Sequence, residues 1–344
     1  GPQWLRMTME PNQQTTTPSA DTVNSSSVDA LRDGGAPAWL VAALERLAKP
    51  EARGIDGYLV ETGECVTLDQ TQTCCRCHFV RLDANRQPRV HALVNALADQ
   101  VIDYCIPRSS LIEAKEHFER TGSMEAVAAL DRQARSLFVN VTTSGEGGEL
   151  LLYLLLERVL GLPQLLCKMR LKTSTRMHVH GVDGVHGKIL DDGRLALYWG
   201  ESKLHARVSK AIAACFESVA PYLLDPGGGA SERDLELVRQ ELDLGDPAVE
   251  QALLRYFDDS QPESARVEIR GACLIGFDLD DYPGTEHGEK LAEGIARRIA
   301  GWQQSIAGQV TACKLERFEL EVFCVPLPSV EDFRARLSTK MGLR

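Results

Sequence analysis

Two strand-forming runs on either side of an Asp-Asp-Gly turn constrain the fold of this chain more than any other feature. The first run covers residues 176–188 and alternates in part between apolar and polar side chains, and the second covers residues 194–201. Asp191, Asp192 and Gly193 lie between them, and an Asp-Gly pair in such a position is typical of a hairpin turn. The sequence therefore predicts a β-hairpin near the middle of the chain.

The hairpin carries a group of charged residues that can do chemistry. Residues i and i+2 of a strand share a face, so Glu201 and Lys203 project together while Ser202 points away. If the register allows, Asp183 on the first strand lies beside them. Two carboxylates at one point bind a hard divalent cation, typically Mg²⁺ with Mn²⁺ as the alternative, and an adjacent lysine can orient or deprotonate a water and stabilise phosphate charge. The structural alternative is an exposed hairpin with a weak ion pair.

A buried helix precedes the hairpin and offers a further carboxylate. Residues 143–146 match the capping box S/T-x-x-E, which predicts a helix start, and Gly161 predicts its end. The helix over 147–160 is apolar almost all round, so we expect it to be buried on most sides. Because Glu146 has a role in the predicted cap, Glu149 is the better candidate for a third metal-site carboxylate. A solvated glutamate is the alternative.

A basic strand is predicted between this helix and the hairpin. Over residues 165–173, Lys168, Arg170 and Lys172 alternate with other residues and therefore share one face of a strand. Arg176 adds a fourth cation, and no acidic residue lies between the helix and the hairpin aspartate. A row of cations beside a metal site would hold phosphates. The alternative is an exposed strand edge that Lys and Arg keep soluble.

The sequence around these motifs resembles the PD-(D/E)xK nucleases and, within them, the HamA family, which supplies the nuclease subunit of the Hachiman anti-phage system. The resemblance is carried by Gly-Val-Asp-Gly-Val-His at 181–186, Tyr-Trp-Gly-Glu-Ser-Lys at 198–203 and Gly-Glu-Gly-Gly-Glu-Leu-Leu-Leu-Tyr at 145–153. It covers roughly residues 40–340. The nuclease family carries a glutamate on its first helix, which agrees with Glu149.

The resemblance implies a fold and a function. The expected fold is α/β, with a mixed-sheet PD-(D/E)xK nuclease-like core and an N-terminal α+β region packed on it. The expected function is a metal-dependent DNA nuclease of antiviral defence, restrained by a HamB-like helicase that senses DNA. The alternative is a non-catalytic nuclease-like module that only binds the helicase or nucleic acid. The intact set of Asp183, Glu201 and Lys203 favours the enzyme.

Composition shifts along the chain predict three parts. Residues 1–35 are rich in Thr, Ser, Asn, Gln and Gly, so we expect a disordered tail, and its first two residues match the remnant of a cleaved expression tag. Residues 36–140 form the N-terminal region and residues 141–344 the nuclease-like domain. The N-terminal region contains Cys-Cys-Arg-Cys-His at 74–78. One C-x-x-C without a second ligand pair favours packed strand cysteines over zinc.

Four histidines crowd the region of the hairpin and leave a zinc hydrolase as a minor alternative. Imidazoles bind transition metals, but the nearest carboxylates have a lysine among them, and a lysine repels a cation unless it serves catalysis. The histidines are His178, His180, His186 and His205.

Charge and hydropathy narrow the class of protein. The formal charge of −11 argues against a constitutive nucleic-acid binder but allows a local basic patch. No apolar run approaches the roughly 20 residues that span a bilayer, and the ten cysteines, scattered singly for the most part, suit reduced thiols. We therefore expect a cytoplasmic protein without a membrane partner. No phosphate-binding Gly-loop with Lys-Ser/Thr is present, so no nucleotide cofactor is expected on this chain.

Overall fold

The computed structural model describes residues 35–52, 54–63, 65–138, 141–167, 169, 181–282 and 289–343. Nearly all of the predicted disordered tail therefore lies outside the described residues. The strands are β1 (Leu59–Glu61), β2 (Val66–Thr67), β3 (Gln72–Val80), β4 (Gln164–Cys167), β5 (Gly184–Ile189), β6 (Leu195–His205), β7 (Val267–Asp278) and β8 (Glu319–Leu327).

Helices surround these strands. The α-helices are α2 (Ala38–Leu47), α3 (Val90–Asp99), α4 (Val101–Cys105), α5 (Arg108–Thr121), α6 (Glu125–Ser136), α7 (Glu146–Leu160), α8 (Val208–Leu224), α9 (Gly229–Glu241), α10 (Pro247–Leu254), α11 (Glu289–Ala312) and α12 (Val330–Met341). Within the part of the chain that the structure describes, no helix combines the length and the apolar character that a membrane crossing requires.

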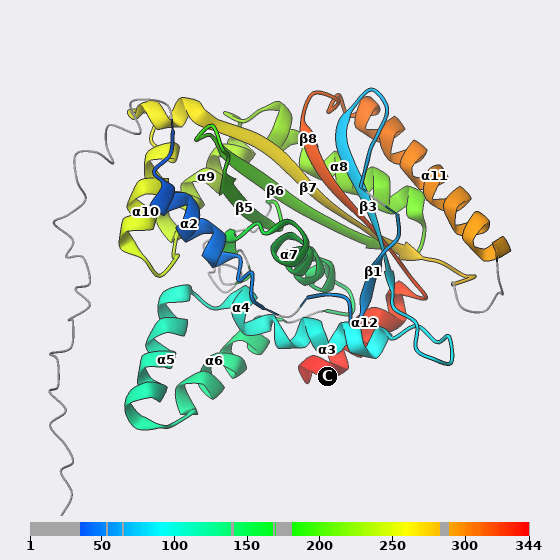
Figure 1. Cartoon of the computed structure of the whole chain (residues 1–344), viewed down its shortest axis with the longest axis horizontal. Helices are drawn as coiled ribbons and strands as arrows, with labels where there is room; N and C mark the ends of the chain where they lie inside the picture. The colour runs from blue at the N-terminus through cyan, green and yellow to red at the C-terminus, as the bar shows by residue number, and fades with distance from the viewer. Residues whose placement is uncertain are drawn as a thin grey trace, which may run out of the picture.

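One mixed sheet of eight strands organises the molecule (Figure 1). The strand order is β1-β3-β8-β7-β6-β5-β4, and β2 pairs with β3 outside this path. The four central strands, β3, β8, β7 and β6, are parallel, whereas β5 and β4 join antiparallel. The centre of β7 is buried from Arg270 to Phe277, as expected for a parallel strand covered on both faces. The predicted α/β class with a mixed sheet is confirmed.

The sheet crosses the predicted boundary at residue 140. β3, from the N-terminal region, pairs in parallel with β8 near the C-terminus, with Cys77 opposite Cys324. The N-terminal region therefore supplies strands to the sheet as well as helices that pack on it. The domain boundary itself stays a prediction.

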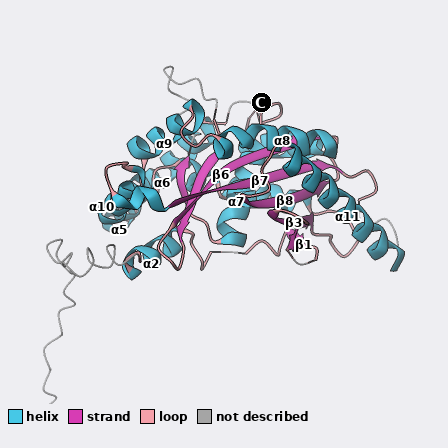
Figure 2. Ribbon diagram, turned by 90° about the horizontal axis from the view of Figure 1, so that it is seen from above, coloured by secondary structure: helices cyan, strands magenta, loops and turns pink. Residues whose placement is uncertain are grey.

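Helices cover both faces of β6, and α7 and α8 lie on opposite sides of the sheet (Figures 1 and 2). A Cβ on Gly148 of α7 would lie 3.0 Å from Ser202 Oγ, so α7 approaches β6 closely only because this residue is glycine. On the other face, the rings of Trp199 and Tyr222 of α8 are 5.4 Å apart. Alternate residues of β6 therefore face different helices, which decides the surroundings of each charged side chain.

Two local expectations were wrong. The N-cap residue of α7 is Gly145 rather than Thr143, the first residue of the predicted capping box, and Ser144 Oγ accepts from Glu146 N at 3.3 Å. Glu146 is the first helical residue and is buried, 5% exposed. The expectation of reduced thiols fails for one pair, because a disulfide joins Cys65 and Cys74, whose Cα atoms are 6.0 Å apart. The end of α7 at Gly161 agrees with the prediction.

Candidate functional site

The predicted hairpin is present, and its register places Asp183 against β6. β5 pairs antiparallel with β6 from Gly184 opposite Gly200 onward, and Asp183 N donates to Gly200 O at 2.8 Å. Because β5 begins at Gly184, no residue of β5 lies opposite Ser202 of β6. The backbone N–H of Ser202 therefore needs another acceptor. Ser202 N and Ser202 Oγ both donate to Asp183 Oδ2, at 2.7 and 2.6 Å. The Asp183 side chain thus continues the ladder of β6 and is held in one position.

Glu201 and Lys203 share a face, as predicted, and that face is covered by α8. Glu201 is 2% exposed, and Lys203 Nζ donates to Glu201 Oε1. Cys215 Sγ of α8 donates to the Glu201 backbone carbonyl at 3.4 Å. The other carboxylate oxygen, Oε2, is buried and makes no regular hydrogen bond among the described residues, although the hydroxyl of Ser218 lies near enough to lower the pKa of the carboxyl.

Burial and a neighbouring carboxylate set the protonation of this pair. Burial, followed by the negative charge of Asp183, raises the pKa of Glu201 to about 8, against the opposing effect of Lys203. For Lys203, burial lowers the pKa, but the attraction of Glu201 outweighs burial and the net shift is upward. At neutral pH the pair therefore holds its protons, and a cation at this point would compete with the proton on Glu201.

The three predicted carboxylates, Glu149, Asp183 and Glu201, do not form one group with all ligand atoms within 4.8 Å of one another. The helix of Glu149, α7, packs on the Ser202 face of β6, and Tyr104 of α4 donates to Glu149 Oε2 at 3.4 Å. Among the described residues, the one group of three metal-ligating side chains with ligand atoms within 4.8 Å consists of cysteines, not of Asp183, Glu201 and Glu149. The assignment of Glu149 as a third metal ligand stays a prediction without geometric support.

The basic strand cannot be judged from the described part of the chain. Its start coincides with β4, but Lys168, Arg170, Lys172 and Arg176 all lie outside the described residues. Their proposed contact with phosphates stays a prediction.

The histidines do not support the zinc-hydrolase alternative where they can be seen. His178 and His180 lie outside the described residues. His186 is fully buried, its Nδ1 lies 2.9 Å from Leu162 O, and burial lowers its pKa to about 4. His186 is therefore a neutral core residue, and among the described residues it belongs to no group of three metal-ligating side chains.

Sequence reasoning missed a group of cations at the exit of β6. The pKa of His205 is lowered by burial and then by the positive charges of Arg334, Lys203 and Lys210. Arg334 of α12 donates to Leu204 O at 3.1 Å from a position 130 residues further along the chain. The i+2 spacing of Lys203 and His205 could have indicated His205, whereas no local pattern points to Arg334.

A buried aspartate also supports the site from outside the hairpin. Asp234 of α9 is 2% exposed, and its Oδ2 accepts from Val182 N at 3.3 Å. It thereby holds the residue that precedes Asp183. Nothing in the sequence distinguished Asp234 from the other acidic residues of the same helix.

The raised pKa of Glu201 predicts a specific dependence of stability on pH. The folded chain keeps a proton on Glu201 up to a pH of about 8, whereas the unfolded chain, with the ordinary value of 4.5, releases it earlier. The free energy of unfolding should therefore fall as pH rises from 4.5 to about 8. Glu201→Gln should remove that part of the slope, whereas exposed Glu331→Gln should keep it. Urea unfolding without divalent ions at a series of pH values measures this, and an unchanged slope in Glu201→Gln would contradict it.

Comparison with known proteins agrees with this architecture. A model of the HamA family matches residues 58–341, which include the hairpin, α7, α8 and the strands that flank β6. No curated protein matches the chain. Because the family model covers most of the sequence, the chain belongs to the HamA family.

Proposed function

We propose that this chain is a metal-dependent nuclease that hydrolyses phosphodiester bonds of DNA. Membership of the HamA family places it in the Hachiman anti-phage defence system. The observation that carries the enzymatic proposal is the Asp183 carboxylate, held by Ser202 at the end of β6 next to the buried pair of Glu201 and Lys203. A cluster in which burial and a neighbouring carboxylate raise the pKa of a glutamate is typical of functional sites.

The donor set fits a hard divalent cation. Asp183 and Glu201 offer carboxylate oxygens, which Mg²⁺ and Mn²⁺ prefer. Their mutual repulsion contributes to the raised pKa of Glu201, and a cation would relieve that repulsion. These two residues would hold the ion, which when bound activates a water and stabilises phosphate charge. The Ser202 hydrogen bonds would keep Asp183 oriented toward it.

Lys203 acts through its charge in this proposal. The upward shift of its pKa keeps the ammonium protonated at neutral pH, which favours stabilisation of negative charge over abstraction of a proton. Its side chain is 30% exposed, whereas that of Glu201 is 3% exposed, so Lys203 can reach a phosphate from its present position. Movement of Nζ from Glu201 to a phosphate would also free a carboxylate oxygen for the cation.

The cations at the exit of β6 extend the site toward a polyanion. Lys203, Lys210 and Arg334 lie around His205, and α8 begins at Val208 without an acidic residue in its first turn. Both the charges and the helix N-terminus favour phosphate groups. On a chain with a formal charge of −11, this local patch would provide most of the attraction for DNA.

A non-catalytic module that binds the helicase or nucleic acid is the second candidate. It is favoured by the present geometry, in which Lys203 Nζ donates to Glu201 Oε1 and the three predicted carboxylates do not form one group with ligand atoms within 4.8 Å. The two candidates differ in whether the folded chain cuts DNA when Mg²⁺ or Mn²⁺ is supplied.

The first test is cleavage of plasmid DNA with Mg²⁺ or Mn²⁺, with and without a chelator. Asp183→Asn, Glu201→Gln and Lys203→Met should each lower the rate about 100-fold or more, and combined changes should add little, because the residues act as a unit. Asp183→Asn keeps an acceptor for Ser202, whereas Asp183→Ala should also cost about 1–3 kcal/mol of stability. Asp192→Asn, in the exposed hairpin turn, is the matched control.

The outcomes of this test separate the candidates. If the Lys203→Met variant cleaved plasmid DNA at the wild-type rate, the site would be assigned wrongly. Absence of cleavage by the folded wild-type chain, both alone and with its helicase and DNA, would favour the non-catalytic module.

The patch at the exit of β6 is tested by binding to short duplex DNA at several salt concentrations. Because each phosphate contact releases counterions, affinity should fall steeply with salt, and Lys210→Gln should weaken binding. His205→Gln should have a smaller effect, because the lowered pKa of His205 keeps its imidazole mostly neutral at neutral pH. Loss of Lys210 should also reduce the slope of log affinity against log salt concentration by about one unit. Lys115→Gln, an exposed lysine on α5, should change neither quantity. Equal effects of Lys115→Gln and Lys210→Gln would contradict a specific patch.

Restraint by a partner helicase is part of the proposal, because unrestrained and sequence-blind cleavage would destroy the cell's own DNA. We expect a stable complex in which the site formed by Asp183, Glu201 and Lys203 is kept from DNA. Plasmid cleavage should be lower for the complex than for an equal concentration of the free chain, and DNA ends with ATP should restore it. Equal cleavage in all samples would contradict restraint and leave the nuclease assignment intact.

A further inference from the structure

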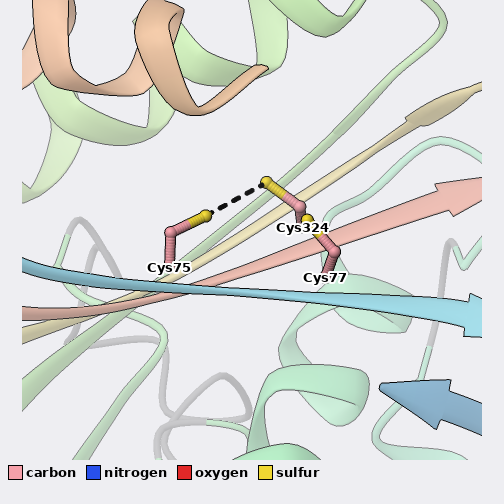
Figure 3. A group of neighbouring side chains, drawn as sticks. All are labelled: Cys75, Cys77 and Cys324. Carbon is pink, nitrogen blue, oxygen red and sulfur yellow. Dashed lines mark hydrogen bonds between the residues drawn. The ribbon is translucent and has the colours of Figure 1, made fainter. Parts of the chain in front are cut away.

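Three cysteine thiols converge in the core, away from the carboxylate site (Figure 3). Cys75 and Cys77 belong to β3 and Cys324 to β8, and β7 lies between β8 and β6. The three residues are 1%, 2% and 0% exposed. Their sulfur atoms all lie within 4.8 Å of one another, and those of Cys75 and Cys324 are 3.9 Å apart.

The side chains lean toward one point, which simple packing on a sheet does not require. Cys75 and Cys77 are alternate residues of one strand, and such residues repeat at about 6.7 Å along the strand. Their sulfur atoms are nevertheless within 4.8 Å of each other. Cys324 is the direct register partner of Cys77 on the neighbouring strand. The three thiols therefore form a triangle on one face of the sheet.

The size of this triangle suits a metal ion at its centre. With a metal–sulfur distance of about 2.3 Å, three sulfur atoms around one ion in a plane would be about 4.0 Å apart. The Cys75–Cys324 separation of 3.9 Å matches this value, and the other two sulfur–sulfur separations are within 4.8 Å. Thiolates are soft ligands that select Cu(I) and similar ions over Mg²⁺.

No fourth protein ligand completes a zinc-like tetrahedron within the described residues. The cysteine group contains three members and no His, Asp or Glu. His78 follows Cys77 in sequence, but it points to the other face of the sheet, where its ring lies 5.7 Å from that of Phe323. Cys74 is joined to Cys65. Because structural zinc is almost always four-coordinate, three sulfur ligands favour an ion that accepts threefold coordination.

We propose that Cys75, Cys77 and Cys324 form a structural site for one soft, thiophilic metal ion of the Cu(I) or Cd(II) type, bound by three sulfur atoms. The ion would join two strands whose cysteines are 249 residues apart in sequence. It would thus tie the N-terminal strand β3 to the C-terminal strand β8 at the centre of the sheet. The site is independent of the proposed nuclease chemistry, which uses oxygen ligands on β5 and β6.

Because the thiols are buried, the ion enters during folding or local opening, and its binding stabilises the folded state. The test therefore refolds the full chain under reducing conditions with one equivalent of Cd(II), which reports thiolate binding through an ultraviolet charge-transfer band. Cys65→Ser with Cys74→Ser serves as the background, since it removes the more exposed pair. In this background we expect native mass spectrometry to show one Cd(II) per chain. The Cd(II)-loaded protein should have a higher Tm than the metal-free protein, and Cu(I) should displace Cd(II).

Single variants assign the ligands. Cys75→Ser, Cys77→Ser and Cys324→Ser should each lose the charge-transfer band and the rise in Tm. Cys105→Ser, which changes a buried cysteine of α4, should keep both. Retention of bound Cd(II) in all three ligand variants, or equal loss in Cys105→Ser, would overturn the proposal.

If the ligand variants fail to fold, X-ray absorption spectroscopy of the Cys65→Ser and Cys74→Ser background protein loaded with Cd(II) identifies the ligand atoms. A first shell of three sulfur atoms supports the site. A shell with fewer sulfur atoms, or a background protein that binds no Cd(II), overturns it.

Discussion

The Asp183 carboxylate accepts two hydrogen bonds from Ser202, and the candidate site depends on this interaction. β5 begins at Gly184, so without Asp183 the backbone N–H of Ser202, between the charged residues of β6, would lack this acceptor. The Asp183 side chain satisfies this donor and is itself brought to the point where Glu201 and Lys203 emerge. A structural requirement of the sheet edge and a requirement of the proposed chemistry are therefore met by the same side chain.

The helices on the two faces of β6 then give its alternate residues different surroundings. The face of Ser202 packs on α7 through Gly148, whereas the face of Glu201 and Lys203 lies under α8. Burial on the α8 side raises the pKa of Glu201 and strengthens every interaction of the pair, because the local dielectric is low. On the Ser202 side of the sheet, Glu149 of α7 accepts a hydrogen bond from Tyr104.

Much of the fold and part of the site could be predicted from local patterns. The hairpin, its turn and the shared face of Glu201 and Lys203 follow from the period of two in strands, and α7 and its end at Gly161 follow from apolar periodicity and the glycine. The helix start near residue 146 also followed from the sequence, but its N-cap is Gly145 rather than Thr143, and tertiary packing buries Glu146. Arg334 and Asp234 could not be found, since they reach the hairpin from helices distant in sequence.

The sequence by itself determined most of the segments that become strands and helices. It also determined that one aspartate and a Glu-x-Lys triplet meet on a hairpin. Both features depend mainly on residues that are neighbours along the chain. Only the tertiary structure decided which face of the sheet each helix covers, how far burial raises the pKa of Glu201, and that Cys324 meets Cys75 and Cys77 across parallel strands. The physical reason is that pairing of β3 with β8 and burial between layers arise from contacts between residues remote in sequence, which no local pattern encodes.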